Sequence, residues 1–157
     1  MQVSFTYDKK KVIQGLRYHF MSRPEIRILV ILVNVFAIVA AVLFYMKKVR
    51  PEYFLLGSCL WLGIMFAFWY LMPTTIYKRE ATFKDSFTIF FTEANVRLEN
   101  ERGYVEWNWD RFTSFFESPN FFHFYFSARS FFLVPKDNMG GDFTHELRAL
   151  LNKHIAK

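Results

Sequence analysis

The sequence lacks the short motifs that mark common catalytic and nucleotide-binding sites. Its 157 residues contain no HExxH, no GxxxxGK[ST], no GxSxG and no GxGxxG. Such motifs place metal ligands, phosphate-binding amides or a nucleophilic serine at fixed spacings. We therefore predict no catalytic residue, no cofactor, no cofactor-binding residue and no metal ligand, and we expect a non-enzymatic protein.

Cysteine is nearly absent, since Cys59 is the single one and lies in an apolar run. One cysteine provides neither a disulfide framework nor a CxxC metal pattern within the chain. This usage is consistent with a reducing compartment such as the cytosol. We interpret Cys59 as a small packing residue, with a reactive thiol as the alternative.

The second half of the chain has no excess of positive charge. The net charge is +6, yet residues 73–157 carry eleven Lys/Arg and eleven Asp/Glu. The excess lies in residues 1–27 and 47–52, which flank the most apolar stretches. A nucleic-acid module would carry its positive charge on its folded domain. The charge distribution therefore argues against a nucleic-acid partner.

Charge is also missing from two long runs, residues 28–46 and 53–72. At 1.5 Å per residue, each run forms a helix of about 30 Å, the thickness of the hydrocarbon layer of a bilayer. The six-residue connection KKVRPE predicts an antiparallel hairpin. We interpret the pair as a two-span transmembrane hairpin, with two buried helices of a soluble core as the alternative.

Basic residues predict the orientation of this hairpin. Six Lys/Arg precede the first span and three follow the second within residues 73–90, against three in the connecting loop. By the positive-inside rule, both termini are expected in the cytoplasm. We therefore predict a multi-pass protein located in the bacterial inner membrane.

Small residues recur at four-residue spacing in both spans, which allows close approach of helix backbones. Asn34 is the strongly polar side chain of the spans, and we interpret it as bonding to a neighbouring helix rather than lining a transport path. The candidate helix–helix contact residues are Asn34, Ala37, Ala41, Cys59, Gly63 and Ala67.

The segment after the spans alternates apolar and polar residues with a period of two, which is typical of half-buried strands. We predict strands within residues 82–91, 96–99, 104–109, 111–118, 120–127 and 130–134, with Val105, Trp107 and Trp109 facing inward. Residues 115–135 contain eight phenylalanines. Pro119, Arg129 and Pro135 interrupt them, so we expect a buried aromatic hairpin rather than a third span.

Two helices and one more strand complete the prediction. Residues 142–156 carry an apolar stripe at helical spacing, and Asp142 is a plausible N-cap. Residues 2–7 alternate as a strand, and residues 9–21 form a basic amphipathic helix. The predicted domains are 1–27 (strand and amphipathic helix), 28–72 (hairpin) and 73–157 (β domain). Seven antiparallel strands with a C-terminal helix indicate a pleckstrin-homology-like (PH-like) barrel or sandwich, so the fold class is membrane-anchored α+β.

The order of these elements resembles the YcxB-like family of bacterial membrane proteins. The matching motifs are Phe5-x-Tyr7, the step from Trp109 to Phe112, and the turn Val134-Pro135-Lys136. The resemblance implies a PH-like C-terminal domain on a two-span hairpin. It implies no enzymatic activity, because none is established for the family.

Three functions stay open at this level. The first is presentation of a cytosolic domain that binds a protein or peptide, or self-associates, with candidate surface residues Phe115, Phe121 and Tyr125. The second is sensing of anionic lipid, with candidate headgroup contacts Lys9, Lys10, Lys11, Arg17, Lys78, Arg79 and Lys84. The third is an accessory subunit of a transport or channel assembly, with Asn34 facing inward.

Overall fold

The computed structural model describes residues 1–155. It forms two compact units, which we call the β unit (Met1–Gly15 with Glu80–Lys157) and the helical unit (Leu16–Arg79). The boundary falls inside helix α1 (Lys9–Ser22). Residues 156 and 157, the ends of the predicted helix 142–156 and of the predicted domain 73–157, lie outside the described residues.

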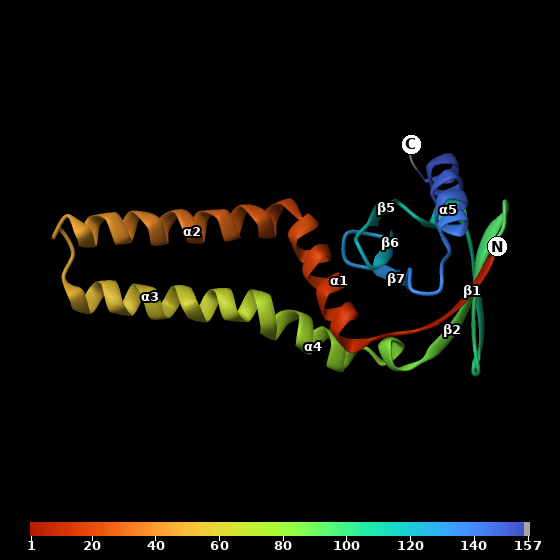
Figure 1. Cartoon of the computed structure of the whole chain (residues 1–157), viewed down its shortest axis with the longest axis horizontal. Helices are drawn as coiled ribbons and strands as arrows, with labels where there is room; N and C mark the ends of the chain where they lie inside the picture. The colour runs from red at the N-terminus through yellow and green to blue at the C-terminus, as the bar shows by residue number, and fades with distance from the viewer. Residues whose placement is uncertain (156–157) are drawn as a thin grey trace. The chain divides into compact units, whose positions relative to one another are not determined.

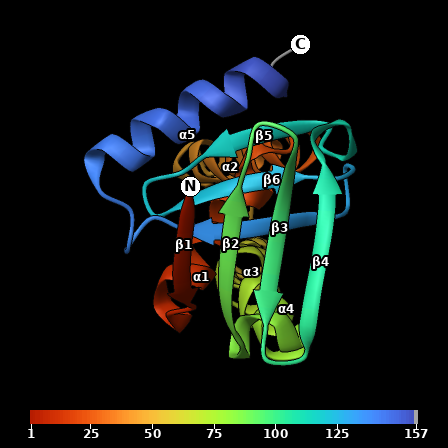
Figure 2. The same ribbon diagram turned by 90° about the vertical axis from the view of Figure 1, so that its right-hand side faces the viewer.

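The β unit contains two antiparallel sheets (Figure 2). The first has the order β1 (Gln2–Thr6), β2 (Ser86–Phe91), β3 (Asn95–Asn100) and β4 (Gly103–Asn108). The second has the order β5 (Ser114–Glu117), β6 (Phe121–Tyr125) and β7 (Phe131–Pro135). The α+β fold is confirmed. Within residues 1–155 the two sheets share no strand pairing, so they do not close into a barrel.

The two sheets pack face to face through their alternate residues. The rings of Phe91 and Phe124 lie 5.9 Å apart, and those of Phe5 and Phe132 lie 6.4 Å apart. Helix α5 (Gly141–His154) confirms the predicted C-terminal helix, but its N-cap is Gly140 and the expected cap Asp142 lies within the first turn. The helix adds its apolar stripe to the same core: Leu147, Leu150 and Leu151, followed by Ile155. Aromatic pairs at these separations add to the transfer energy of the buried side chains.

Strand β6 is buried on both faces. Phe122 and Phe124 point into the core between the sheets, while Phe121 on the other face is 1% exposed. The start of α1 covers that second face: Gly15 lies over the Phe121 ring, and the Asn120 amide donates to Gln14 Oε1 at 2.9 Å. The expectation that Phe121 is an exposed partner residue is therefore wrong, because the N-terminal helix occupies its face.

Two local segments differ from the predicted strands. The strand predicted from residue 82 begins at Ser86, because residues Ala81–Lys84 form the 3₁₀ turn η2. That turn buries Phe83, whose ring lies edge-on to Tyr7 at 5.2 Å. Trp109 belongs to the 3₁₀ turn η3 (Trp109–Arg111) rather than to a strand, and it is buried there.

The helical unit contains an antiparallel pair of long helices (Figure 1). They are α2 (Pro24–Tyr45) and α3 (Pro51–Phe66), and the second continues through the π-helix η1 (Ala67–Leu71) into α4 (Met72–Arg79). Pro24 and Pro51 each begin a helix at a position whose N–H makes no intrahelical hydrogen bond, so proline loses nothing there. Phe44 and Phe54 stack at 4.3 Å across the pair.

Both long helices are apolar enough and long enough to cross a membrane. In neither helix is a residue of the most apolar 18-residue window buried by the rest of the protein. The interpretation as a buried pair in a soluble core is therefore not supported, because a core helix would be covered. Large apolar side chains that face outward along a whole helix require a partner other than water.

Glu117 joins the second sheet to α5. Its carboxylate accepts from Arg148 Nε at 2.8 Å and Nη2 at 2.7 Å, and from Lys136 Nζ at 2.5 Å. The hydrogen bond from Arg148, together with that from Lys136, lowers the pKa of the Glu117 carboxyl to about 2 from its ordinary 4.5. The ionised form is thus stabilised in the folded protein.

A larger side chain at Gly15 should loosen the contact between α1 and β6. A Cβ atom there would meet Phe121 Cδ2 at 2.9 Å. We expect Gly15→Leu to lower the free energy of unfolding by about 1–3 kcal/mol, the usual cost of overpacking. Urea unfolding of the detergent-solubilised chain, followed by tryptophan fluorescence, measures this. The matched control is Gly141→Leu, because no atom lies within 4 Å of a Cβ built at Gly141; equal losses at both sites would contradict the packing.

Removal of the Glu117 charge should change the acid dependence of stability. Because the pKa is depressed on folding, the stabilisation is present above pH 4.5 and is lost as the pH falls towards 2. Glu117→Gln should lower the free energy of unfolding by about 1 kcal/mol at neutral pH and flatten its decline across that window. Exposed Glu101→Gln is the control, and an unchanged acid slope in Glu117→Gln would count against this ion pair.

Candidate functional site

Strand β4 is the open edge of the first sheet (Figure 2). It pairs with β3 in the register Asn100↔Gly103 to Asn95↔Asn108. Within residues 1–155 no other strand, loop or side chain bonds to its backbone. Unpaired edge groups are a template for another strand, so proteins usually cover or interrupt them.

The other edges of the two sheets carry a side-chain donor or are short. At β1, Asn138 Nδ2 donates to the Ser4 carbonyl at 2.6 Å. At β7, the Tyr7 hydroxyl donates to the Leu133 carbonyl at 2.7 Å, and burial raises the pKa of Tyr7 far above its ordinary value, so this donor stays protonated. Strand β5 has four residues, whereas β4 has six. Among these edge strands β4 is the longest, and within residues 1–155 no side chain bonds to its backbone.

The β3–β4 turn determines which β4 groups point outward. Asn100 and Gly103 flank a two-residue turn and pair with each other. Hydrogen-bonded and non-hydrogen-bonded pairs alternate along an antiparallel ladder. Gly103, Val105 and Trp107 therefore bond to β3. The amides and carbonyls of Tyr104, Glu106 and Asn108 point away from the sheet.

The side chains of β4 are held in place but remain accessible. Tyr104 is 62% exposed, and the Arg97 guanidinium lies over its ring at 4.2 Å. The Asn95 amide donates to the Glu106 carboxylate. Val105 was expected to be buried; it is 51% exposed although its neighbour on the same face, Trp107, packs against Phe126 and Phe132. At the sheet edge no further strand covers the Val105 side chain.

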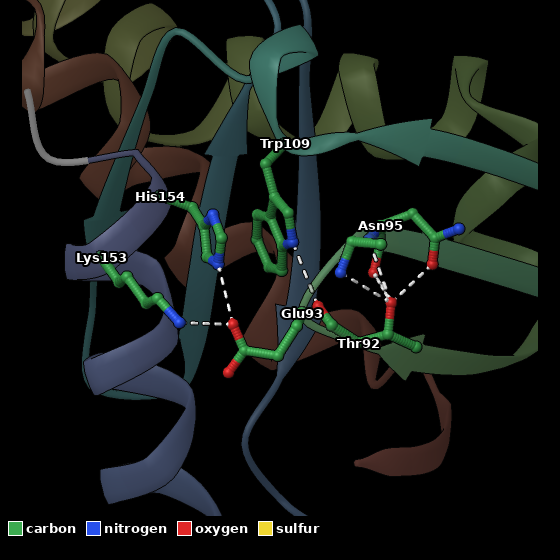
Figure 3. A network of polar contacts seen from close by, with 7 residues as sticks. Thr92, Glu93, Asn95, Trp109, Lys153 and His154 are labelled. Carbon is green, nitrogen blue, oxygen red and sulfur yellow. Dashed lines mark hydrogen bonds and ion pairs between the residues drawn. The ribbon is translucent and has the colours of Figure 1, made fainter.

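A polar network joins the β2–β3 turn to the end of α5 (Figure 3). Glu93 accepts from Lys153 Nζ at 2.6 Å and contacts His154 Nε2 at 3.3 Å, and both interactions lower the pKa of the Glu93 carboxyl. His154 stacks on Trp109 at 5.1 Å, and Trp109 Nε1 donates to the Thr92 carbonyl at 3.1 Å. These groups satisfy one another, so we interpret the network as a tie that holds α5.

The predicted headgroup contacts have different surroundings. Lys11 Nζ donates to Asp137 at 2.6 Å. Arg17 Nε donates to the Trp69 carbonyl at 2.9 Å in the π-helix, with the guanidinium 4.9 Å from the Trp69 ring. Exposed side chains are found at the remaining positions: Lys9, Lys10, Lys78, Arg79 and Lys84. Lys11 and Arg17 thus have protein partners that would compete with a lipid phosphate.

The predicted helix–helix residues are only partly brought together. Ala37 and Ala41 line an apolar groove of about 480 Å³ between α2 and α3. Cys59 is exposed, and a Cβ built at Gly63 meets nothing within 4 Å, so this stripe does not pack against α2. Ala67 lies in the π-helix. Asn34 Nδ2 donates to the Val30 carbonyl at 2.8 Å and contacts Met65 Sδ at 3.9 Å on α3.

The predicted aromatic partner surface is not assembled either. Besides the buried Phe121, Phe115 is half-buried and packs on the core, and Tyr125 is half-buried beside Phe131 at 5.9 Å. The accessible pair Tyr104 and Val105 was missed as a surface. The sequence feature that indicates this surface is the place of the strand in the chain. The strand comes last in a run of hairpins and a turn follows it, so it lies at an edge of the sheet.

In residues 1–155 no three His, Cys, Asp or Glu side chains come together in a way that would hold a metal ion. Comparisons of the chain with protein-family models, with curated proteins and with solved structures find no match. The resemblance to the YcxB-like family accordingly stays a prediction that rests on short motifs and on the order of elements. The apolar helical surface and the β4 edge are the features of residues 1–155 that bear on function.

Proposed function

We propose that the chain is a non-enzymatic membrane protein that presents a PH-like β sandwich for interaction with another polypeptide. In this proposal the helical unit anchors the chain in the bilayer, and the partner adds a strand at β4. The open β4 edge is the observation that carries the interaction, because strand addition gives affinity through main-chain hydrogen bonds and selectivity through alternate side chains.

The anchor is supported by the outer surfaces of α2 and of the continuous helix Pro51–Arg79. Side chains such as Phe36, Ile38 and Leu62 are between 58% and 70% exposed. Within lipid this surface is matched by acyl chains, and each helix satisfies its own backbone groups. The distribution of Lys and Arg favours both termini in the cytoplasm. A PH-like arrangement is supported by seven strands in two sheets followed by α5.

Strand binding is better supported than the two alternatives. Headgroup sensing loses two of its predicted contacts, since Lys11 and Arg17 have protein partners. A transport role would use the Asn34 amide, which already donates to the Val30 carbonyl of its own helix. The β4 backbone, in contrast, carries outward donors and acceptors that the described chain leaves unused.

Membrane anchoring is tested by flotation and alkaline extraction of the full chain. We expect the protein to float with vesicles and to resist extraction. Phe36→Arg combined with Leu62→Arg should shift it to the soluble or aggregated fraction, because an arginine near the centre of a span costs about 2.5–3.5 kcal/mol. Tyr104→Arg on β4 is the control. Release of the unmodified protein by alkali would refute the anchor.

Strand addition is tested by hydrogen exchange at β4. We expect the amides of Tyr104 and Glu106 to exchange about tenfold more slowly in membranes than in dilute detergent, since a hydrogen bond worth about 1.4 kcal/mol slows opening by that factor. The amides of Val105 and Trp107, which bond to β3, serve as internal controls. Equal exchange of the Tyr104 and Glu106 amides in both conditions would rule out a strand at this edge.

A further inference from the structure

We propose that the strand that adds to β4 is β4 of a second copy of this chain, antiparallel and centred on Val105. The inference rests on strand binding at β4, and it goes further by naming the partner and the register. It follows from three properties of the strand, namely which backbone groups point outward, which residues carry charge, and how far the strand extends.

The outward backbone groups restrict the registers. Tyr104, Glu106 and Asn108 must meet one another across a two-fold axis, because the residues between them bond to β3. An antiparallel pair of identical strands can then be centred on any residue from Tyr104 to Asn108. Any register that sets an even-numbered residue against an odd-numbered one leaves the outward groups of both strands unpaired.

Side chains and strand length select among these registers. A centre at Glu106 sets two carboxylates directly opposite each other, which is destabilising. A centre at Tyr104 confines the overlap within β4 to residues 103–105, because β4 begins at Gly103. A centre at Trp107 or Asn108 confines it to residues 106–108 or less, because β4 ends at Asn108. A centre at Val105 pairs residues 103–107 with themselves. It sets Tyr104 against Glu106 in both directions, so each pair can exchange both of its backbone hydrogen bonds.

The same register uses the accessible side chains of β4. Val105, which is 51% exposed on the inner face, lies against Val105 of the second copy and extends the apolar face. Tyr104 meets a carboxylate to which its hydroxyl can donate. Arg97 and Asn95 already hold Tyr104 and Glu106 in the free chain, which reduces the entropy lost on pairing.

An edge-to-edge contact is small and its affinity is weak, so the fraction of paired chains depends on their concentration. Copies confined to one membrane meet at a far higher effective concentration than copies free in solution. A two-fold axis through the Val105 pair also closes the assembly as a dimer, because it uses up the open edge of both copies. The partner needed is therefore one that the membrane itself concentrates.

The test is disulfide formation between full-length chains in native membranes, in a Cys59→Ala background. Residues of a non-hydrogen-bonded antiparallel pair have Cα atoms about 4.5 Å apart, within the range that a disulfide spans. We expect oxidation of Val105→Cys to give a cross-linked dimer at least about fivefold above Ser4→Cys, an exposed position in the middle of the β1 edge strand. Tyr104→Cys should cross-link when mixed with Glu106→Cys, and not alone.

A second variant tests the backbone contact without a cysteine. Glu106→Pro removes an outward amide while leaving the β3–β4 ladder intact, so its circular dichroism and unfolding midpoint should match the parent protein. With two intermolecular hydrogen bonds lost across the two-fold axis, the dimer fraction should fall about tenfold by chemical cross-linking. An unchanged dimer fraction would overturn the proposal.

The outcomes separate this inference from the proposed function. Slow exchange of the Tyr104 and Glu106 amides without a Val105→Cys dimer would mean that another polypeptide occupies the edge, and the inference fails while the proposed function stands. A Val105→Cys dimer in a chain that alkali releases from membranes would refute the anchor and keep the pairing. Cross-linking at Ser4→Cys equal to that at Val105→Cys would indicate random collision and overturn the inference.

Discussion

Burial of both faces of β6, the central strand of the second sheet, is the constraint on which the β unit depends. Phe122 and Phe124 cannot be covered by the same element as Phe121, because alternate residues of a strand point to opposite faces. The first sheet covers one face, and α1 up to Gly15 covers the other. The N-terminal segment is therefore part of the β unit, although 64 residues of the helical unit, Leu16–Arg79, separate it from β2 in the chain.

This requirement explains the position of the helical insertion. Strands β1 and β2 pair along their length, Gln2↔Phe90 to Thr6↔Ser86, and the helical unit leaves the β unit after Gly15 and returns at Glu80. Polar contacts then hold the remaining elements in place. Glu117 ties the second sheet to the middle of α5 through Arg148, and Glu93 ties the β2–β3 turn to the C-terminal end of the same helix. Each carboxylate meets two cationic or imidazole groups, so α5 is held at two points along its length.

The treatment of sheet edges connects the fold with the proposed function. Asn138 and Tyr7 supply donors to edge carbonyls of β1 and β7, which discourages pairing there. Strand β4 has no such donor, and it combines outward backbone groups with an accessible valine and tyrosine. A protein that leaves its longest edge strand open risks aggregation unless that edge has a partner. Pairing with a second copy would remove the risk and the open edge together.

The sequence by itself determined the elements, since apolar periodicity is local: two uncharged runs, seven strands and an amphipathic C-terminal helix all follow from residue spacing. Tertiary structure decided which surfaces are free. The alternation of residues along its strand suggested that Phe121 is exposed, but α1 covers it. The same alternation suggested that Val105 is buried, but the sheet ends beside it. Whether Lys11 and Arg17 face a lipid or a protein group was likewise open, because their partners Asp137 and Trp69 are distant in sequence. Spacing along the chain says which face a residue takes, whereas what covers that face depends on segments that fold back from far away.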